Sequence, residues 1–422
     1  MHTRATLAAR ARPLFPALRR EVAGRPVAYF DGPGGTQVPR SVVDAMSEYL
    51  LQHNANDGWA FATSRETDAA LTRARANVAT FINAASPGEI VFGANMTTLA
   101  FHIARAIGRS LRPGDEIVVT ELDHHANIDP WLALERDYGA VVKYVPLLEN
   151  RPEMDIAAYE RLLGPRTRLV AVGLSSNAFG TINPVARMTR AAHAVGALVF
   201  VDAVHAAAHA ALDVRALDAD MLAFSAYKVY GPHVGIAYCR DELLERLEFP
   251  RLRPQERTGS KRAETGTLNH EGIVGAGAAI DFLAGLSGSE NTAAPRERIV
   301  ATMNGAHAEE QIVFDALRAG LRTIPGVALY EPSADAARHP TLAITFGDRD
   351  AGEIAAKLSN ADGVFVSHGN FYAQTAVAKV APAATACGGL LRAGVGLYST
   401  LEDAERLVGA LRRYGANGRA AN

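Results

Sequence analysis

Short apolar runs alternate with segments of helical period between residues 86 and 240. This alternation predicts a parallel sheet flanked by helices, which is an α/β fold. The predicted strands are 89–92, 116–120, 141–145, 169–173, 198–201, 221–224 and 236–238, and helices are predicted at 97–110 and 188–195. A turn containing Gly and Pro separates the last two strands, so we expect at least one strand to run antiparallel.

A different pattern follows in the C-terminal part of the chain. Residues 250–275 are rich in Arg, Gly and Thr without clear periodicity, which indicates a loop or linker. Beyond them the pattern predicts a smaller α+β unit. Its predicted elements are a helix at 296–317 that ends before Gly320, a strand at 342–346, a helix at 351–358 and a last helix at 401–414.

Composition narrows the possible functions. Among 422 residues, 48% are hydrophobic and 21% charged, as in an ordinary globular protein, and the net charge of −2 argues against a nucleic-acid partner. Cys239 and Cys387 are too few and too isolated for a disulfide framework, which fits the cytoplasm. No apolar run approaches the roughly 20 residues of a spanning helix, so we expect no membrane segment.

Two polar groups follow neighbouring predicted strands. Asp202 ends the run Val199-Phe200-Val201, and Lys228 follows the next strand in Ser225-Ala226-Tyr227-Lys228. Taken singly, a capping Asp and a surface Lys are the commoner interpretation. Together they suit pyridoxal phosphate, which needs a lysine for a Schiff base and a carboxylate to keep its pyridine nitrogen protonated.

Other segments complete such a site. Residues 121–127 supply His124 to stack on the ring, and the adjacent pair His124-His125 is a poor metal motif, so no metal is predicted. The segment 93–98, with Met96 and Thr97, offers backbone amides and hydroxyls at a predicted helix start for a phosphate. The glycines 32, 34 and 35 do not form the fingerprint of a nicotinamide site and precede no clear helix.

The order of these segments resembles the class V aminotransferase group, and specifically its cysteine desulfurase-like proteins, over nearly the whole chain. The matching segments are Asn-Met-Thr-Thr at 95–98, Asp-His-His-Ala-Asn at 123–127, Ser-Asn-Ala-Phe-Gly-Thr at 176–181, Val-Asp-Ala-Val-His-Ala at 201–206 and Ser-Ala-Tyr-Lys-Val-Tyr-Gly-Pro at 225–232. The resemblance implies the fold of type I pyridoxal phosphate-dependent transferases. It implies a large domain at 30–290 with a mixed, mostly parallel seven-stranded sheet, and a small α+β domain made of 1–29 and 291–422. It also implies a homodimer with shared sites.

The resemblance assigns roles to individual residues. It implies Lys228, Asp202 and His124 as the catalytic residues and His205 as the residue that faces the cofactor's phenolic oxygen. The implied phosphate ligands are Thr97, Ser225, Tyr227 and, from the partner subunit of a dimer, Thr267. Met96 is predicted as a further cofactor-binding residue. Asn177 and Arg392 match the residues that bind the substrate α-carboxylate, where a guanidinium suits a planar carboxylate.

One departure decides the predicted function. Desulfurases carry a sulfur-accepting Cys on a loop whose counterpart here, residues 366–373, contains none and ends in Phe371-Tyr372-Ala373. A tyrosine hydroxyl, with a pKa near about 10, is a poor substitute, and Tyr372 is instead expected to line the substrate pocket. We therefore predict a lyase that cleaves a side-chain bond at Cβ, such as carbon–sulfur, of a cysteine-like or other β-substituted L-amino acid, through an aldimine and a quinonoid. The alternatives are an aminotransferase, an epimerase, a decarboxylative aldolase, or a desulfurase with a relocated cysteine.

Overall fold

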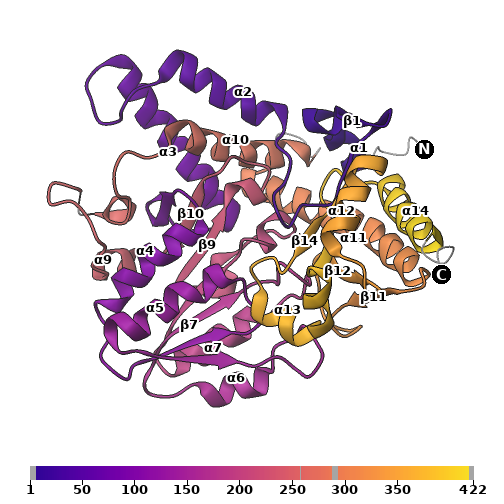
Figure 1. Ribbon diagram of the computed structural model, residues 1–422. Helices are drawn as coiled ribbons and strands as arrows, with labels where there is room; N and C mark the ends of the chain where they lie inside the picture. The colour runs from indigo at the N-terminus through magenta and orange to yellow at the C-terminus, as the bar shows by residue number, and fades with distance from the viewer. Residues whose placement is uncertain (1–5, 257, 288–292, 418–422) are drawn as a thin grey trace.

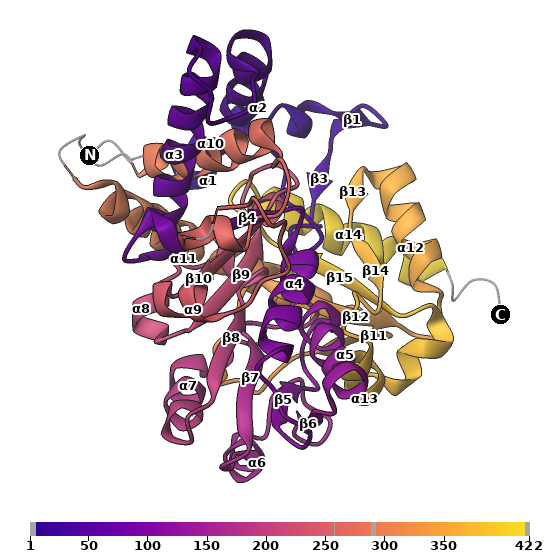
Figure 2. The same cartoon turned by 90° about the vertical axis from the view of Figure 1, so that its left-hand side faces the viewer.

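A seven-stranded sheet forms the centre of the protein (Figures 1 and 2). The computed structural model describes residues 6–256, 258–287 and 293–417. The strand order is β4-β10-β9-β8-β7-β5-β6, and β10 alone in this sheet runs antiparallel to its neighbours. The predicted α/β fold with a mixed, mostly parallel sheet is confirmed, and so is the antiparallel strand after the Gly/Pro turn.

The strands lie close to their predicted positions. Their bounds are β4 Ile90–Gly93, β5 Glu116–Thr120, β6 Val141–Val145, β7 Thr167–Gly173, β8 Leu198–Asp202, β9 Met221–Ser225 and β10 Gly235–Cys239. The predictions for β5 and β6 are confirmed to the residue, and the others differ by one or two residues at their ends. Asp202 and Ser225 thus belong to the last positions of two strands.

Alternate side chains of each strand point to opposite faces, and each face is covered by its own helices. Val118, Val170 and Val199 belong to a core that includes residues of α3 Ala62–Ile82, α7 Val185–Ala194, α10 His270–Leu286 and the first half of α11 Pro295–Arg322. Ile117, Leu169 and Phe200 belong to a second core that includes residues of α4 Met96–Gly108 and α5 Asp129–Tyr138. Both faces are therefore apolar, as in a sheet covered on both sides.

A four-stranded antiparallel sheet lies beside the large one, in the orange and yellow part of Figure 1. Its order is β11-β12-β15-β14, with β11 Val327–Tyr330, β12 Thr341–Phe346, β14 Ser367–Gly369 and β15 Leu390–Gly394. It shares a core with the second half of α11, with α12 Ala351–Lys357 and with α14 Leu401–Asn417. Near the N-terminus, β3 Ala28–Tyr29 pairs in parallel with β13 Val364–Phe365.

The predicted end of the long helix before Gly320 is wrong, because α11 continues to Arg322. A Cβ at Gly320 would lie 2.6 Å from Cγ2 of Val408 in α14. Glycine at this position therefore permits the close approach of two helices rather than ending one. The predicted linker at 250–275 is also shorter than expected, since α10 begins at His270.

The remaining elements complete the description. They are α1 Leu7–Ala11, β1 Glu21–Val22, β2 Arg25–Pro26, α2 Arg40–Glu48, α6 Ile156–Leu162, α8 Val214–Leu217, α9 Asp241–Arg246 and α13 Gln374–Val380, with short 3₁₀ helices that include η6 Ala206–Ala208, η7 Ala226–Lys228 and η10 Pro382–Cys387. Within the described ranges, no helix is long and apolar enough to cross a bilayer. The domain boundaries stay a prediction, and the one at 290 lies outside the described residues.

Candidate active site

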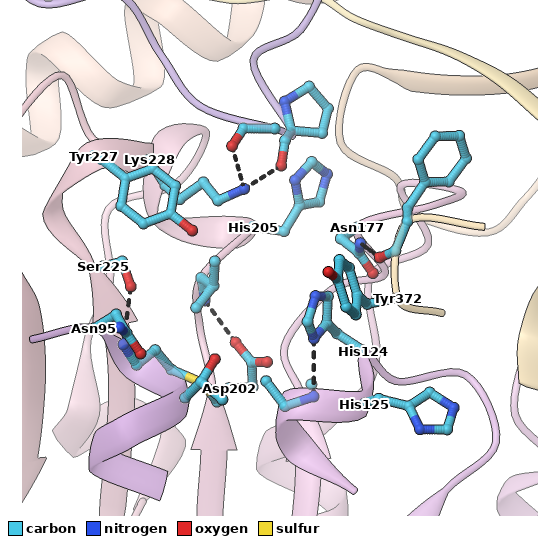
Figure 3. A pocket seen from close by; sticks show the side chains of 18 of the residues that line it. Asn95, His124, His125, Asn177, Asp202, His205, Ser225, Tyr227, Lys228 and Tyr372 are labelled. Carbon is cyan, nitrogen blue, oxygen red and sulfur yellow. Dashed lines mark hydrogen bonds between the residues drawn. The ribbon is translucent and has the colours of Figure 1, made fainter. Parts of the chain in front are cut away.

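A cavity of about 1020 Å³ lies where the parallel strands of the large sheet end and the small sheet begins (Figure 3). Open α/β sheets place ligand sites at this edge because the loops that follow parallel strands converge there. Of the predicted site residues, the cavity is lined by Met96, Thr97, His124, Asn177, Asp202, His205, Ser225, Tyr227, Lys228, Tyr372 and Arg392. Thr267 does not line it and lies on an exposed segment before α10.

Lys228 ends η7, directly after β9, and its amine projects into the cavity. The Nζ donates hydrogen bonds to the carbonyl oxygens of Pro33 and Gly34, the latter at 2.8 Å. Desolvation in the cavity and the nearby charge of Arg392 together lower the pKa of this amine to about 7, against the attraction of Asp31 and Asp202. A large fraction of Lys228 is therefore an uncharged nucleophile near neutral pH.

Asp202 is a buried carboxylate at the end of β8. Its Oδ1 accepts a hydrogen bond from the Val204 amide at 2.9 Å. Burial raises its pKa to about 6, while the Val204 bond and the charge of Lys228 lower it. A protonated nitrogen of a bound ring would stabilise the ionised form of this carboxylate in the same way as any nearby cation.

A second carboxylate, Asp123, was missed by sequence reasoning. It lies just after the end of β5, and like Asp202 it lines the cavity. Its Oδ2 accepts hydrogen bonds from Asn127 Nδ2 and the Gly173 amide, both at 2.8 Å. Burial and the neighbouring Asp202 raise the pKa of Asp123 to about 7. The signal that could have found it is its position, since it follows a buried strand of the same sheet edge.

His124 lines the same cavity from the loop that follows β5 (Figure 3). Its Nδ1 accepts a hydrogen bond from the Ala126 amide at 2.9 Å, which fixes the ring. Burial, together with the nearby Lys228 and His125, lowers its pKa to about 4. The imidazole is therefore neutral at pH 7 and presents a flat, uncharged ring to the cavity.

The N-terminus of α4 forms a polar corner of the cavity. Asn95 caps this helix, since its Oδ1 accepts the Thr98 amide at 2.9 Å, and the Met96 amide donates to Ser225 Oγ at 3.0 Å. A Cβ at Gly235 would lie 2.5 Å from the carbonyl carbon of Asn95, so only glycine lets β10 approach this turn. Thr97 is exposed here. Helix N-termini with hydroxyl groups favour phosphate.

Tyr227 lies above this corner and has an aromatic partner. His233, which sequence reasoning missed, stacks on the Tyr227 ring with centroids 4.8 Å apart and planes at 19°. Both residues line the cavity. Desolvation raises the pKa of Tyr227, as does the charge of Asp202, so its hydroxyl stays protonated at neutral pH and can donate a hydrogen bond.

Arg392 approaches the same cavity from β15 of the small sheet. Its Nε donates to Ser367 Oγ and its Nη1 to the carbonyl oxygen of Asn177, both at 3.0 Å, and Asp31 Oδ1 lies 3.6 Å from Nη2. The guanidinium lies over the Phe371 ring, 4.2 Å from its centroid. Burial lowers the pKa of Arg392 to about 10, so the guanidinium stays charged at neutral pH. Its hydrogen bonds and its contact with the ring hold it in one orientation.

The loop that carries Phe371 and Tyr372 has a strained backbone. Phe371 and Tyr372 have φ values of 57° and 56°, in the left-handed region. The Asn177 side-chain amide donates to the carbonyl oxygen of Phe371 at 2.9 Å, and the His125 amide donates to that of Tyr372 at 2.7 Å. These two bonds hold the strained loop. The side-chain N–H of Asn177 is thus already hydrogen-bonded to Phe371. The buried Oδ1 of Asn177 has no hydrogen-bond partner in the described part of the chain.

The sequence of this chain matches that of the Aminotransferase class-V family over residues 28–407. The chain belongs to this family. It is similar to cysteine desulfurases of Pectobacterium atrosepticum (35% identity, covering 96% of this chain and 97% of the relative) and Dickeya dadantii (33%, 96% and 96%). Among solved structures it resembles a cysteine desulfurase from Escherichia coli, with a TM-score of 0.83, 28% identity and 98% and 99% coverage.

Membership of this class V family makes the protein a cysteine desulfurase-like enzyme that depends on pyridoxal phosphate. The chemistry of the cavity fits this cofactor. A weakly basic amine, a buried carboxylate, a flat neutral imidazole and a helix N-terminus all line one space. These groups match, in turn, an aldehyde, a pyridine nitrogen, a ring face and a phosphate.

Proposed function

We propose that this enzyme cleaves the carbon–sulfur bond at Cβ of a cysteine-like L-amino acid without using a sulfur atom of its own. The observation that carries the proposal is the position of the two cysteines, because neither Cys239 nor Cys387 lines the cavity. Phe371 and Tyr372 line it instead.

Cys239 lies at the wrong end of the sheet for sulfur transfer. It pairs with Met221 at the start of β9, whereas Ser225 at the end of β9 lines the cavity. Four residues of strand separate these positions, a distance of about 13 Å. Cys239 is also buried, and burial raises the pKa of its thiol, which disfavours the thiolate needed for attack.

Cys387 also does not line the cavity. It is in η10, before β15, and its Sγ contacts the carbonyl oxygen of Gly347 at 4.0 Å. A persulfide on either cysteine would form away from Lys228. This arrangement supports release of sulfur to solution.

In the proposed mechanism, Lys228, Asp202 and His124 would hold the cofactor, with Met96, Thr97, Ser225 and Tyr227 at its phosphate. When bound, pyridoxal phosphate supplies an electron sink for the charge left by proton removal at Cα. Arg392 binds the substrate carboxylate and thereby orients Cα toward Lys228. The uncharged form of the Lys228 amine, which is well populated near pH 7, removes the Cα proton. Tyr372 borders the substrate side chain.

The overall reaction balances without a further oxidant or reductant. R–S–CH₂–CH(NH₃⁺)–COO⁻ and one water give R–SH, pyruvate and ammonium. The Cα–H and Cβ–S bonds break, and the electron pair of the Cβ–S bond leaves with sulfur, which takes up a proton. Water then replaces the amine at Cα.

Product analysis tests this proposal. The holoenzyme is incubated without oxygen with L-cysteine, S-alkyl cysteines and cysteine sulfinate, and keto acid, ammonium, alanine and released sulfur species are measured. We expect pyruvate and ammonium in equal amounts with at least one substrate. Alanine together with protein-bound sulfur would instead indicate a desulfurase, and a new amino acid formed with an acceptor would indicate a transferase or aldolase.

We further propose that the enzyme is a homodimer with shared sites. Leu51, Trp59 and Phe61 are 78%, 62% and 54% exposed on the hairpin formed by α2 and α3, which projects from the body in Figure 1. Such an apolar surface favours association with a second copy. Thr267 lies outside the cavity of its own chain, which supports a role in the partner's site. Light scattering tests this, since Leu51→Asp should yield monomers and a monomeric wild type would contradict it.

A further inference from the structure

Four histidines, three of them buried and His307 half-buried, form a cluster that reaches the cavity at His205. His205 and His209 flank η6, His339 precedes β12, and His307 lies on α11. Ring centroids are 5.2 Å apart for His205 and His209, and 5.3 Å apart for His209 and His339. No three His, Cys, Asp or Glu side chains among the described residues are arranged to hold a metal ion, so the cluster requires a different explanation.

Two hydrogen bonds link this cluster to its surroundings. His205 Nε2 lies 3.2 Å from Thr341 Oγ1, and His209 Nδ1 lies 2.9 Å from Glu310 Oε2. His205 is 4% exposed and Thr341 is 1% exposed. Within the described part of the chain, the Thr341 hydroxyl has no second hydrogen-bond partner.

The single partner of this hydroxyl determines where the proton of His205 lies. A buried hydroxyl hydrogen without an acceptor is unfavourable, and a neutral imidazole has one nitrogen that donates and one that accepts. The Thr341 O–H bond is satisfied only if it donates to His205 Nε2. The proton of the imidazole is then on Nδ1.

We propose that Thr341 is a positioning residue that fixes His205 as the Nδ1–H tautomer, so that this histidine presents a hydrogen-bond donor to the cavity. The acceptor would be an oxygen anion of the bound cofactor, a part that rests on the proposed function. The tautomer itself is a property of the protein alone.

The charges around His205 favour its neutral form. Burial lowers the pKa of His205 well below its usual value, and His209, His339, Arg392 and Lys228 lower it further. From α11, Glu310 faces the cluster and bonds to His209, and His307 contacts His339 edge to face. His205 is therefore neutral around pH 7, and its tautomer is well defined.

The backbone holds Thr341 rigidly toward His205. Thr341 begins β12 and pairs with Gly394 of β15, the strand that carries Arg392. A Cβ at Gly180 would lie 2.5 Å from the carbonyl oxygen of His339 and 3.2 Å from that of Thr341, so the loop after β7 lies tightly against this turn. A hydroxyl on such a rigid element can select one tautomer of its partner.

The first test uses nitrogen-15 NMR of histidine side chains in the cofactor-free protein, with His205→Gln to assign the signal. Thr341→Val removes the hydroxyl with little change in shape, and Thr341→Ser retains it. We expect the proton of His205 on Nδ1 in the wild type and in Thr341→Ser, and a large Nε2–H population in Thr341→Val. A wild-type proton on Nε2, or no change in a folded Thr341→Val, would overturn the proposal.

The second test measures binding of pyridoxal phosphate to the same cofactor-free proteins by fluorescence. Loss of one oriented donor should weaken binding by about 5- to 10-fold in Thr341→Val, while Thr341→Ser stays within about twofold. Equal affinities for both variants would overturn the donor role. Neither test uses turnover, so a different product outcome in the lyase assay would leave the tautomer assignment standing.

Discussion

The ring of Tyr372 stacks on the imidazole of His124, with centroids 5.3 Å apart and planes at 26°. His124 is fixed by the Ala126 amide, whereas Tyr372 is 73% exposed and carried by a strained loop. In the proposed function, the planar ring of the cofactor would stack on the face of His124 that Tyr372 does not cover. The loop that carries Phe371 and Tyr372 thus covers one face of His124.

Tyr372→Ala should impair substrate binding more than folding. Removing the ring uncovers His124 and widens the pocket, so we expect KM to rise about 10-fold while the free energy of unfolding changes by less than about 0.5 kcal/mol, as at other exposed positions. Tyr372→Phe keeps the stacking ring and should resemble the wild type. If Tyr372→Phe were as impaired as Tyr372→Ala, the hydroxyl would take part in the chemistry.

Lys228 should react with aldehydes at unusually low pH. Its pKa is lowered to about 7, so its amine is protonated and unreactive below pH 7 and free above it. Exposed lysines, with a pKa of about 10.4, become reactive only at higher pH. In the cofactor-free protein, borohydride trapping of pyridoxal on Lys228, measured by peptide mass spectrometry, should reach half its maximum near pH 7. A midpoint above about pH 9 would show that the cavity does not lower the pKa.

Arg392→Lys should raise KM strongly although it keeps the charge. The guanidinium is oriented by Ser367, by the carbonyl oxygen of Asn177 and by the Phe371 ring. An ammonium cannot reproduce that planar geometry. We expect an increase in KM of about 10- to 100-fold, a loss of roughly 1.4 to 2.7 kcal/mol of binding. An unchanged KM would remove Arg392 from the substrate site.

Two glycines of α11 provide a matched pair for stability. A Cβ at Gly320 would collide with Val408, whereas one at Gly305 would meet only Leu7 Cδ1 at 3.9 Å. Gly320→Ala should therefore destabilise by about 1–3 kcal/mol through overpacking. Gly305→Ala should stabilise by up to about 1 kcal/mol through helix propensity. Thermal unfolding measures both, and two stabilising substitutions would contradict the close contact between α11 and α14.

Much of the large sheet could be predicted from sequence because its strands are apolar runs bounded by turns. β5 and β6 were found to the residue. α10 was missed for the opposite reason, since it is rich in Gly and Ala and is buried on several sides, against α2, α3 and α11. A helix without a polar face has no periodicity to detect.

The residues of the candidate site were also predicted only in part. Asp202, Lys228 and His124 were found because each belongs to or follows a strand that ends at one edge of the sheet. Asp31 and His233 were missed because they come from irregular segments, where neither periodicity nor strand position marks a residue. Asp31 reaches Arg392 through a long-range bridge to Gly394 of β15. His233 meets Tyr227 within the connection between β9 and β10.

The most direct test of sulfur release without a protein nucleophile is the turnover of the Cys239→Ser/Cys387→Ser variant. The holoenzyme variant and the wild type are assayed for pyruvate, ammonium and free thiol on the best substrate. We predict a kcat within about twofold of the wild type and one thiol per pyruvate, because neither cysteine lines the cavity. A folded, cofactor-loaded variant that has lost turnover by about 100-fold or more would contradict the account.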